Sequence, residues 1–291
     1  MKVNAIIIGA GRSGTTTLYK YLENHPDVCF SDIKEVHYFS VEDLYQRGED
    51  YYHSFWKQCK DENIKVAADT YLLIDKNAPK RIAEYNPDMK IVVILRNPAE
   101  RTWSSFQYAK NNGYISDNKS FIQSIKEEEE HILSSDITVQ NNLCNLWQSK
   151  YYEHVSYWSE FFPQKNILLL KTSDLKNNTN FLLKQLSTFL DIKEFSSDAA
   201  LITSNKSAKA KSKALQQFLL NRNNPLRAAL RKILPDKMKE KILHSNLPEK
   251  LSSINRKETS YEPLSAEDRK YAEQLLEKDT KRLEKIFGIK F

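Results

Sequence analysis

Short runs of apolar residues, rich in isoleucine and valine, alternate along the chain with segments whose apolar positions repeat every three or four residues. The apolar runs are nearly continuous at residues 3–8, 65–68, 91–95 and 167–170. Such runs are typical of strands that are buried on both faces of a parallel sheet. The periodic segments between them predict helices near residues 15–23, 76–85, 99–110 and 146–161. This alternation predicts an α/β fold in which helices cover both faces of a parallel β-sheet.

The rest of the chain contains three segments of different character. Residues 126–130 form an acidic run on a predicted helix, which favours a solvated face. Residues 204–213 are small and basic, and they predict a mobile loop. Residues 214–247 contain an amphipathic segment that opens with Asn224 as a cap and Pro225 at the first helical position. An amphipathic helix can lie on a membrane surface, but it more often packs on its own domain, so we predict a helical lid.

A last helix is predicted over residues 265–287. Ser265 with Asp268 forms a capping box, and Gly288 follows the last periodic residue. The positions expected to face inward are Tyr271, Leu275, Leu283, Ile286 and Phe287.

Length and charge limit the classes of function. The 291 residues suit one domain, 1–291, and the net charge of +6 suits an anionic ligand without proving one. There is no compact basic stripe interleaved with aromatic residues, so nucleic acid is not an expected partner. No apolar run is long enough to span a membrane, and the first predicted strand leaves no room for a signal peptide. Oligomeric state cannot be inferred.

The cysteines are three in number and well separated in sequence, at Cys29, Cys59 and Cys144. An odd number without a C-x-x-C pair predicts neither a disulfide framework nor a zinc site. We therefore expect a reducing, cytoplasmic location and no metal.

The most informative segment is AIIIGAGRSGTTTLYKYL, residues 5–22. A predicted strand leads into a glycine-rich turn and then into a helix that begins with three threonines. Glycines allow a sharp turn and close approach of a ligand, and a helix N-terminus presents free N–H groups to an anion. The residues that predict this phosphate site are Gly11, Arg12, Ser13, Gly14, Thr15, Thr16 and Thr17.

Two other templates fit the same segment. As G-x-G-x-x-G it resembles a dinucleotide-binding fingerprint of an NAD-type oxidoreductase, which requires an acidic residue about 20 positions on; Asp32 is only near that place. As a P-loop of a nucleotide kinase it has Thr15 where the lysine is required. The positive charge lies inside the loop instead, at Arg12.

A basic residue followed by Ser-Gly-Thr-Thr after a strand resembles the phosphosulfate loop of sulfotransferases that use 3′-phosphoadenosine 5′-phosphosulfate (PAPS). The segment 91–106 resembles the 3′-phosphate motif of that family, with Arg96 ending a strand and Ser104 eight residues later. A guanidinium and a hydroxyl at the carboxyl end of a parallel strand can hold one phosphate. The alternative is that Arg96 and Arg101 pair with surface carboxylates.

Residues 34–39, KEVHYF, resemble the glycan sulfotransferase branch, in which an acidic residue of such a segment is the catalytic base. The resemblance implies that Glu35 is the base, that His37 is the reserve candidate, and that Arg12 stabilises the leaving phosphate. The alternative for Glu35 is a carboxylate that pairs only with Lys34. A late basic loop covers the nucleotide in this family, which implies roles for Lys206 and Ser207; a solvated linker is an equal alternative.

The resemblance therefore implies a sulfotransferase that moves a sulfuryl group from PAPS to a hydroxyl or amine of a saccharide or small metabolite, and releases 3′-phosphoadenosine 5′-phosphate (PAP). The acceptor itself cannot be identified, because variable loops build acceptor pockets.

Overall fold

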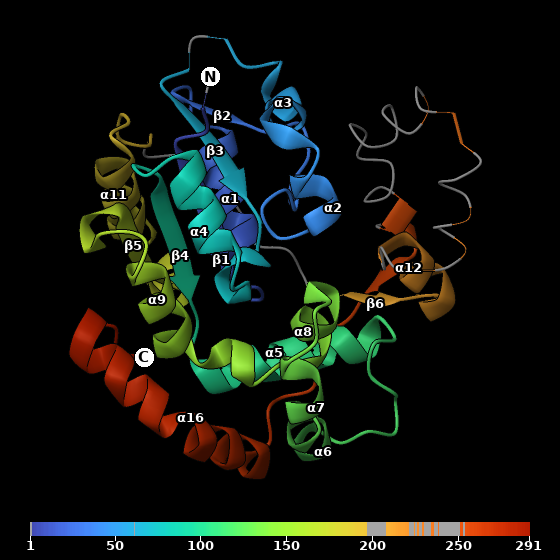
Figure 1. The fold of residues 1–291 in the computed structure, drawn as a ribbon. Helices are drawn as coiled ribbons and strands as arrows, with labels where there is room; N and C mark the ends of the chain where they lie inside the picture. Colours follow the sequence, from blue (N-terminus) through green and yellow to red (C-terminus); the bar gives the residue numbers. More distant parts are fainter. Residues whose placement is uncertain are drawn as a thin grey trace.

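The computed structural model describes residues 2–60, 62–196, 208–220, 251–252 and 254–291, with a few isolated positions between 221 and 250. Its centre is a five-stranded sheet with the strand order β2-β3-β1-β4-β5, and every neighbouring pair is parallel (Figure 1). The strands are β1 (Ala5–Gly9), β2 (Val28–Phe30), β3 (Ile64–Ala68), β4 (Lys90–Leu95) and β5 (Ile167–Lys171). The predicted parallel sheet is confirmed.

Helices and short 3-10 turns connect these strands. The α-helices are α1 (Thr15–Glu23), α2 (Glu42–Tyr45), α3 (Gly48–His53), α4 (Ala78–Tyr85), α5 (Pro98–Asn111), α6 (Phe121–Lys126), α7 (Glu129–Ile132), α8 (Ile137–Leu143), α9 (Tyr151–Ser159), α10 (Thr172–Asn177), α11 (Thr179–Leu190), α12 (Lys213–Leu220) and α16 (Ala266–Phe287). The 3-10 turns are η1 (Ser54–Trp56), η2 (Leu72–Ile74), η3 (Trp147–Ser149) and η4 (Gln164–Asn166). The helix predicted over residues 146–161 is thus η3 followed by α9.

The sheet has a hydrophobic core on each face. Successive side chains of a strand point to opposite faces, so Ile6 and Ile8 lie in one core while Ala5 and Ile7 lie in the other. The first core is covered by α3, α4, α9 and one residue of α16, and the second by α1 and α11. This double cover explains why the strands are apolar throughout.

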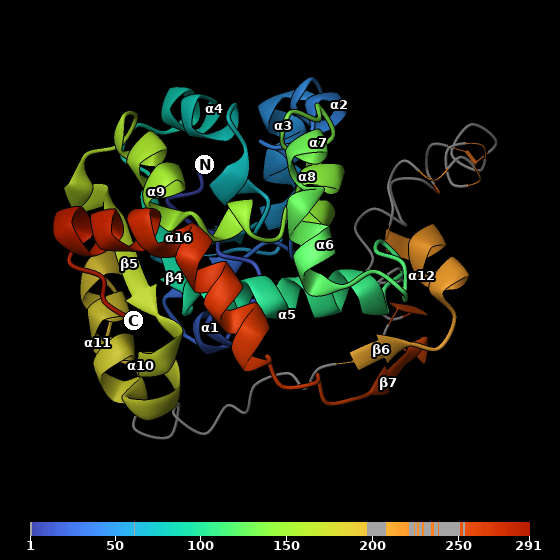
Figure 2. The same cartoon turned by 90° about the horizontal axis from the view of Figure 1, so that it is seen from below.

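Helix α16 crosses the outside of the domain, in contact with α5 and α9 (Figures 1 and 2). Its predicted ends are confirmed: Ser265 Oγ accepts the Asp268 N–H at 3.0 Å, and Gly288 takes φ of +71°. The predicted inward face is wrong in part, because Leu275 and Ile286 are 46% and 56% exposed. The buried positions are Ala272, Leu276 and Leu283, since the helix rests on two neighbouring helices and presents its small Ala272 to them.

The basic segment 204–213 is not a loop where the structure describes it. Residues Ala208–Ala210 form strand β6, which pairs antiparallel with β7 (Arg256–Glu258), and α12 begins at Lys213. Positions 204–207 and most of the predicted lid 214–247 lie outside the described residues. Asn224 does accept the Leu226 N–H at 3.0 Å, as its predicted capping role requires. Among the described residues, no helix is long and apolar enough to cross a membrane.

The cysteine prediction is wrong. Cys29 on β2 and Cys59 after η1 form a disulfide, with their Cα atoms 5.8 Å apart, and Cys144 is free and buried. Their separation of 30 residues concealed the pair, because the connection between β2 and β3 folds back onto the sheet edge. The cysteines therefore give no support to a reducing compartment.

The acidic run 126–130 is not a solvated face throughout, because Glu128 is 3% exposed. Its two carboxylate oxygens accept the backbone N–H groups of Leu146 and Trp147 at 2.7 and 3.0 Å. Burial raises the pKa of Glu128 to about 7. This side chain therefore connects the end of α6 to the turn before η3.

The raised pKa of Glu128 predicts a pH dependence of stability. Between the ordinary value of 4.5 and about 7, the folded state holds a proton that the unfolded state has lost. The contribution of Glu128 to the free energy of unfolding is therefore complete below pH 4.5, and it is lost as the pH rises through 7, with a total of about 3 kcal/mol. Urea unfolding of the wild type and Glu128→Gln at pH 5 and pH 8 measures this contribution of Glu128. The difference in the free energy of unfolding between the two proteins should change with pH; a constant difference contradicts the assignment.

Candidate functional site

The predicted phosphate-binding residues lie at the carboxyl edge of the sheet. Strand β1 lies at the centre, and the loop that follows it is flanked by the ends of β3 and β4. Asp69 and Thr70 follow β3, Arg96 follows β4, and Thr172 follows β5. Ligands of open α/β sheets bind at such an edge, beside the point at which the strand order reverses.

The loop from Gly9 to Gly14 has the geometry of an anion cradle. Gly14 takes φ of +100°, and a Cβ placed there would lie 3.0 Å from Leu175 Cδ2, so only glycine fits. Helix α1 begins directly after it, and its first N–H groups have no partner within the helix. Thr15 and Thr17 are buried and Thr16 is half-buried. The predicted loop is therefore brought together as expected.

Arg12 is held by two tyrosines that are distant in sequence. Its backbone is left-handed, with φ of +70°. The guanidinium carbon lies 4.8 Å from the ring centroid of Tyr108, and Nη2 donates to the Tyr261 hydroxyl at 3.2 Å. Its Nε is buried and has no hydrogen-bond partner among the described residues. A buried donor without a partner fits a bound anion, because such a group is otherwise costly.

Tyr261 belongs to the segment between β7 and α16, which passes α5 (Figure 2). The Trp103 indole on α5 donates to the Glu262 carbonyl at 2.8 Å. This contact fixes the segment against α5 beside Arg12. Neither tyrosine lies in a motif that could have indicated this contact.

Arg96 and Ser104 occupy the expected positions at the end of β4 and on α5. Arg96 pairs with Glu100, with Nε and Nη2 at 3.2 and 3.1 Å from one carboxylate oxygen, so the pairing named as the alternative is present. The other Glu100 oxygen lies 3.6 Å from Arg269 on α16. The Arg96 side chain remains 29% exposed, while Ser104 is buried. Because this ion pair is partly exposed and therefore weak, Arg96 can exchange Glu100 for a phosphate.

Arg101 does not pair with a surface carboxylate. It is 1% exposed, and its Nε donates to the Gly11 carbonyl of the phosphate loop at 3.0 Å. The surface ion pair considered for this arginine from the sequence is therefore wrong. The position of Arg101 five residues after Arg96, on the helix that follows β4, is the signal that it faces the same loop.

Glu35 is connected to the phosphate loop through Thr70. Its carboxylate accepts the Lys34 ammonium at 2.8 Å and the Thr70 hydroxyl at 3.3 Å. Thr70 in turn lies beside the loop, because a Cβ placed on Gly11 would lie 3.8 Å from Thr70 Cβ. The Glu35 side chain is 28% exposed. The pair with Lys34 is therefore present, but it is not the only contact of this carboxylate.

His37 is hydrogen-bonded to Asp69, a residue that was not among the predicted site residues. The His37 Nδ1 lies 3.0 and 3.1 Å from the two Asp69 oxygens. Asp69 also accepts the Tyr71 N–H at 3.1 Å and the Ser40 hydroxyl at 3.4 Å. Burial acts to raise the pKa of Asp69, but His37 and these hydrogen bonds lower it below its ordinary value. An ionised Asp69 holds the Nδ1 proton and leaves Nε2 as the basic nitrogen.

Both candidate bases have left-handed backbones, with φ of +62° at Glu35 and +58° at His37. Such conformations are unusual for side chains with a Cβ, and they concentrate at functional sites. The Glu35 N–H donates to the Ala68 carbonyl at 2.9 Å, which fixes the segment to the end of β3.

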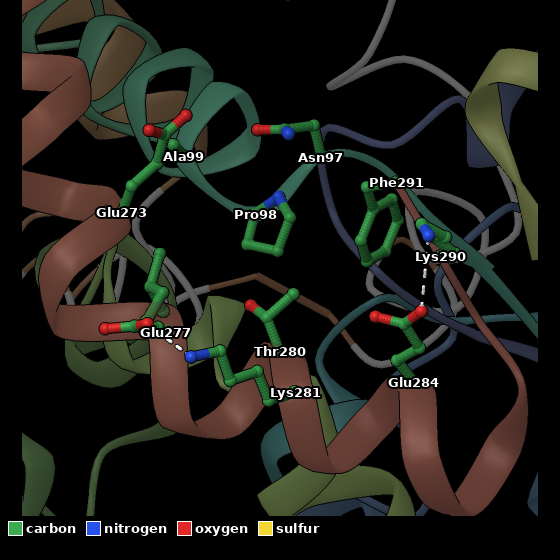
Figure 3. Close-up of a pocket in the computed structure, with 11 residues that line it drawn as sticks. Asn97, Pro98, Ala99, Glu273, Glu277, Thr280, Lys281, Glu284, Lys290 and Phe291 are labelled. Atoms are coloured by element: carbon green, nitrogen blue, oxygen red, sulfur yellow. Dashed lines mark hydrogen bonds and ion pairs between the residues drawn. The ribbon is translucent and has the colours of Figure 1, made fainter.

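A separate pocket of about 290 Å³ lies between the start of α5 and α16. Figure 3 shows that charged side chains of α16 line one side of it, and that Glu277 pairs with Lys281 and Glu284 with Lys290. None of the predicted site residues lines it. Because its charged side chains are already in ion pairs, with Glu273 paired to Arg269 outside the pocket, we assign no ligand to it.

Two of the predicted site residues, Lys206 and Ser207, lie outside the described residues. The sequence also predicted that no metal is bound. Within the described part of the chain, the one group of potential metal ligands is Cys29, Cys59 and Glu62, and its two sulfur atoms form the disulfide. No other group of three such side chains gathers there.

Comparison with known proteins is consistent with this geometry. The chain is 28% identical over 206 residues to the bifunctional heparan sulfate N-deacetylase/N-sulfotransferase of Drosophila melanogaster, covering 64% of this chain and 19% of that protein. It is 26% identical over 196 residues to human heparan sulfate glucosamine 3-O-sulfotransferase 6, covering 67% of this chain and 54% of that protein. The chain thus spans about a fifth to a half of the length of these relatives.

A solved structure shares the fold over the whole chain. The sulfotransferase from Alicyclobacillus acidocaldarius superposes with a TM-score of 0.67 at 17% identity, covering 100% of this chain and 98% of that one. The sulfotransferase domain family matches residues 2–288. A match over nearly the entire chain, on a fold with a phosphate loop after its first strand, shows that the chain belongs to the sulfotransferase domain family.

Proposed function

We propose that this sulfotransferase moves the sulfuryl group of PAPS to a hydroxyl or amino group of a saccharide. The observation that carries the proposal is the connection from Glu35 through Thr70 to the glycine-rich loop that contains Arg12. It puts a carboxylate beside an anion cradle, as transfer from a phosphosulfate to a nucleophile requires. The relatives named for heparan sulfate support a saccharide acceptor.

The donor supplies an activated sulfuryl group on a phosphate that leaves with negative charge. Arg12 and the N–H groups at the start of α1 bind the 5′-phosphosulfate and stabilise the charge that develops on the leaving oxygen. Arg96 and Ser104 bind the 3′-phosphate, because a guanidinium and a hydroxyl suit a single phosphate. These assignments need no metal.

On the acceptor side, Glu35 removes the proton of the attacking hydroxyl or amine. Its Lys34 and Thr70 partners orient the carboxylate. His37, with its Nδ1 proton held by Asp69, is the second candidate base. The family assignment argues against the NAD-dependent and ATP-dependent alternatives, since neither chemistry uses Arg96 with Ser104.

Titration with PAP by calorimetry, without metal, tests the donor. We expect Arg96→Ala to weaken PAP binding by about 10- to 100-fold, because one charge-assisted contact to the 3′-phosphate is lost. Arg269→Ala is the matched control, since Arg269 contacts the same Glu100 from α16 but is not assigned to the nucleotide. That variant should bind PAP like the wild type.

ATP and NAD serve as comparators in the same titration. Preference for PAP supports the proposal. Preference for ATP with Mg²⁺, or for NAD, contradicts it, and so does equal loss of PAP binding in the Arg96 and Arg269 variants.

A further inference from the structure

Arg101 is a buried arginine without a carboxylate partner among the described residues. Besides the Gly11 carbonyl, its guanidinium donates to the Asn145 carbonyl at 2.8 Å, to Ser149 Oγ at 3.3 Å and to Gln148 Oε1 at 2.6 Å. The nearby Glu128 directs its oxygens to backbone N–H groups instead. An isolated buried charge is costly, so neutral packing would be more stable at this position.

The contact between Arg101 and the Gly11 carbonyl determines the orientation of the peptide unit between Gly11 and Arg12. A trans peptide is planar, and its C=O and N–H groups point in opposite directions. Arg101 draws the Gly11 carbonyl into the protein at 3.0 Å. The N–H of Arg12, in the same peptide unit, is therefore directed away from Arg101.

Thr172 acts in the same way on the peptide unit between Ser13 and Gly14. Its hydroxyl lies 2.5 Å from the Ser13 carbonyl and 3.1 Å from the Leu95 carbonyl, at the end of β4. The N–H of Gly14 is therefore directed away from Thr172. Between them, the Ser13 N–H donates to the Ala10 carbonyl at 3.2 Å and closes the turn.

We propose that Arg101 and Thr172 are positioning residues for the phosphate loop, which turn two carbonyls inward so that the N–H groups of Arg12 and Gly14 face the 5′-phosphosulfate. The inference rests on the proposed PAPS donor and deepens it. Neither residue needs to touch the nucleotide. Without these side chains, a flipped peptide would present a carbonyl oxygen to the anion and repel it.

The charge of Arg101 adds to this effect. Burial lowers the pKa of Arg101 to about 10, so the guanidinium remains protonated at neutral pH. A positive charge under the loop, without a paired carboxylate, raises the electrostatic potential where the anion binds. This explains why an arginine is present where an apolar side chain would pack at lower cost.

The test compares two nucleotides, PAP and adenosine 3′-monophosphate, by calorimetry. Only PAP has a phosphate for the loop, whereas both have the phosphate assigned to Arg96. We expect Thr172→Val to weaken PAP binding by about 10-fold and Arg101→Met by about 30-fold or more. Binding of adenosine 3′-monophosphate should change less than about twofold in both.

Thr102→Val is the matched control. Thr102 is also buried, and its hydroxyl also makes hydrogen bonds. Its partners are the Pro98 carbonyl at 2.8 Å and Ser149 Oγ, and neither belongs to the loop. This variant should bind both nucleotides like the wild type. Thermal unfolding of all three variants shows whether each is folded, and Thr172→Val retains the test if Arg101→Met does not fold.

An equal loss of affinity for PAP and for adenosine 3′-monophosphate in Thr172→Val would show a general structural effect. It would overturn the inference while leaving the donor assignment intact. Unchanged PAP affinity in Thr172→Val would also overturn it. Failure of the wild type to bind PAP would contradict the assignment of PAPS as the donor, and the inference would fall with that assignment.

Discussion

Replacing Glu35 by glutamine is expected to lower kcat for sulfuryl transfer by about 10²–10⁴-fold, the range expected when a positioned general base is removed. PAP binding should remain close to that of the wild type, because the carboxylate contacts Lys34 and Thr70 and is assigned to the acceptor. Transfer rates with PAPS and a heparan-type oligosaccharide, together with calorimetry of PAP, measure both quantities.

Two variants make the Glu35 result specific. Glu42→Gln removes a carboxylate that is likewise paired with a cation, Arg81, but lies on α2 outside the site, so its kcat should be unchanged. His37→Asn tests which of the two candidate bases, Glu35 or His37, removes the proton of the acceptor. A greater loss of kcat in His37→Asn than in Glu35→Gln would assign the base to His37 and make Asp69 its positioning residue.

Replacing Arg12 by methionine is expected to lower kcat by about 10²–10³-fold, as seen when a donor to a developing anion is removed. Its Nε is a buried donor without a partner among the described residues, and the two tyrosines hold its guanidinium in place. Arg12→Lys should retain much of the rate, because a lysine keeps the positive charge although it loses the planar fork. Single-turnover transfer with PAPS measures the effect on the chemical step.

Arg47→Met is the control for Arg12. Arg47 also stacks on a tyrosine, with its guanidinium carbon 3.9 Å from the Tyr51 ring centroid, but it precedes α3 and lies outside the site. Its loss should leave kcat unchanged. Equal rates for Arg12→Met and Arg47→Met would remove Arg12 from the leaving-group assignment.

The fold could be predicted because the strands of a parallel sheet are apolar on both faces and stand out in the sequence. The exception is β2, whose three residues Val28–Phe30 are too few to form a recognisable run. The phosphate loop could be predicted because its glycines and threonines are consecutive. Chemistry that depends on adjacent residues is visible in a sequence.

Contacts between distant segments could not be predicted. Asp69 meets His37 across 32 residues, and Tyr261 meets Arg12 across 249. The same limit explains two of the errors. Cys29 and Cys59 are brought together by a chain reversal, and Glu128 is buried because its carboxylate binds a backbone turn that lies 18 residues further on.

The distance in sequence between Arg12 and Tyr261 has a consequence for the order of events during synthesis. Translation at about 5–20 residues per second separates these two residues by roughly 12 to 50 s. During that interval the whole sheet, which ends at Lys171, is made before the tyrosine that holds Arg12 exists. A nascent chain can therefore form the central sheet early, but Arg12 acquires its contact with Tyr261 only after the segment that contains Tyr261 has left the ribosome.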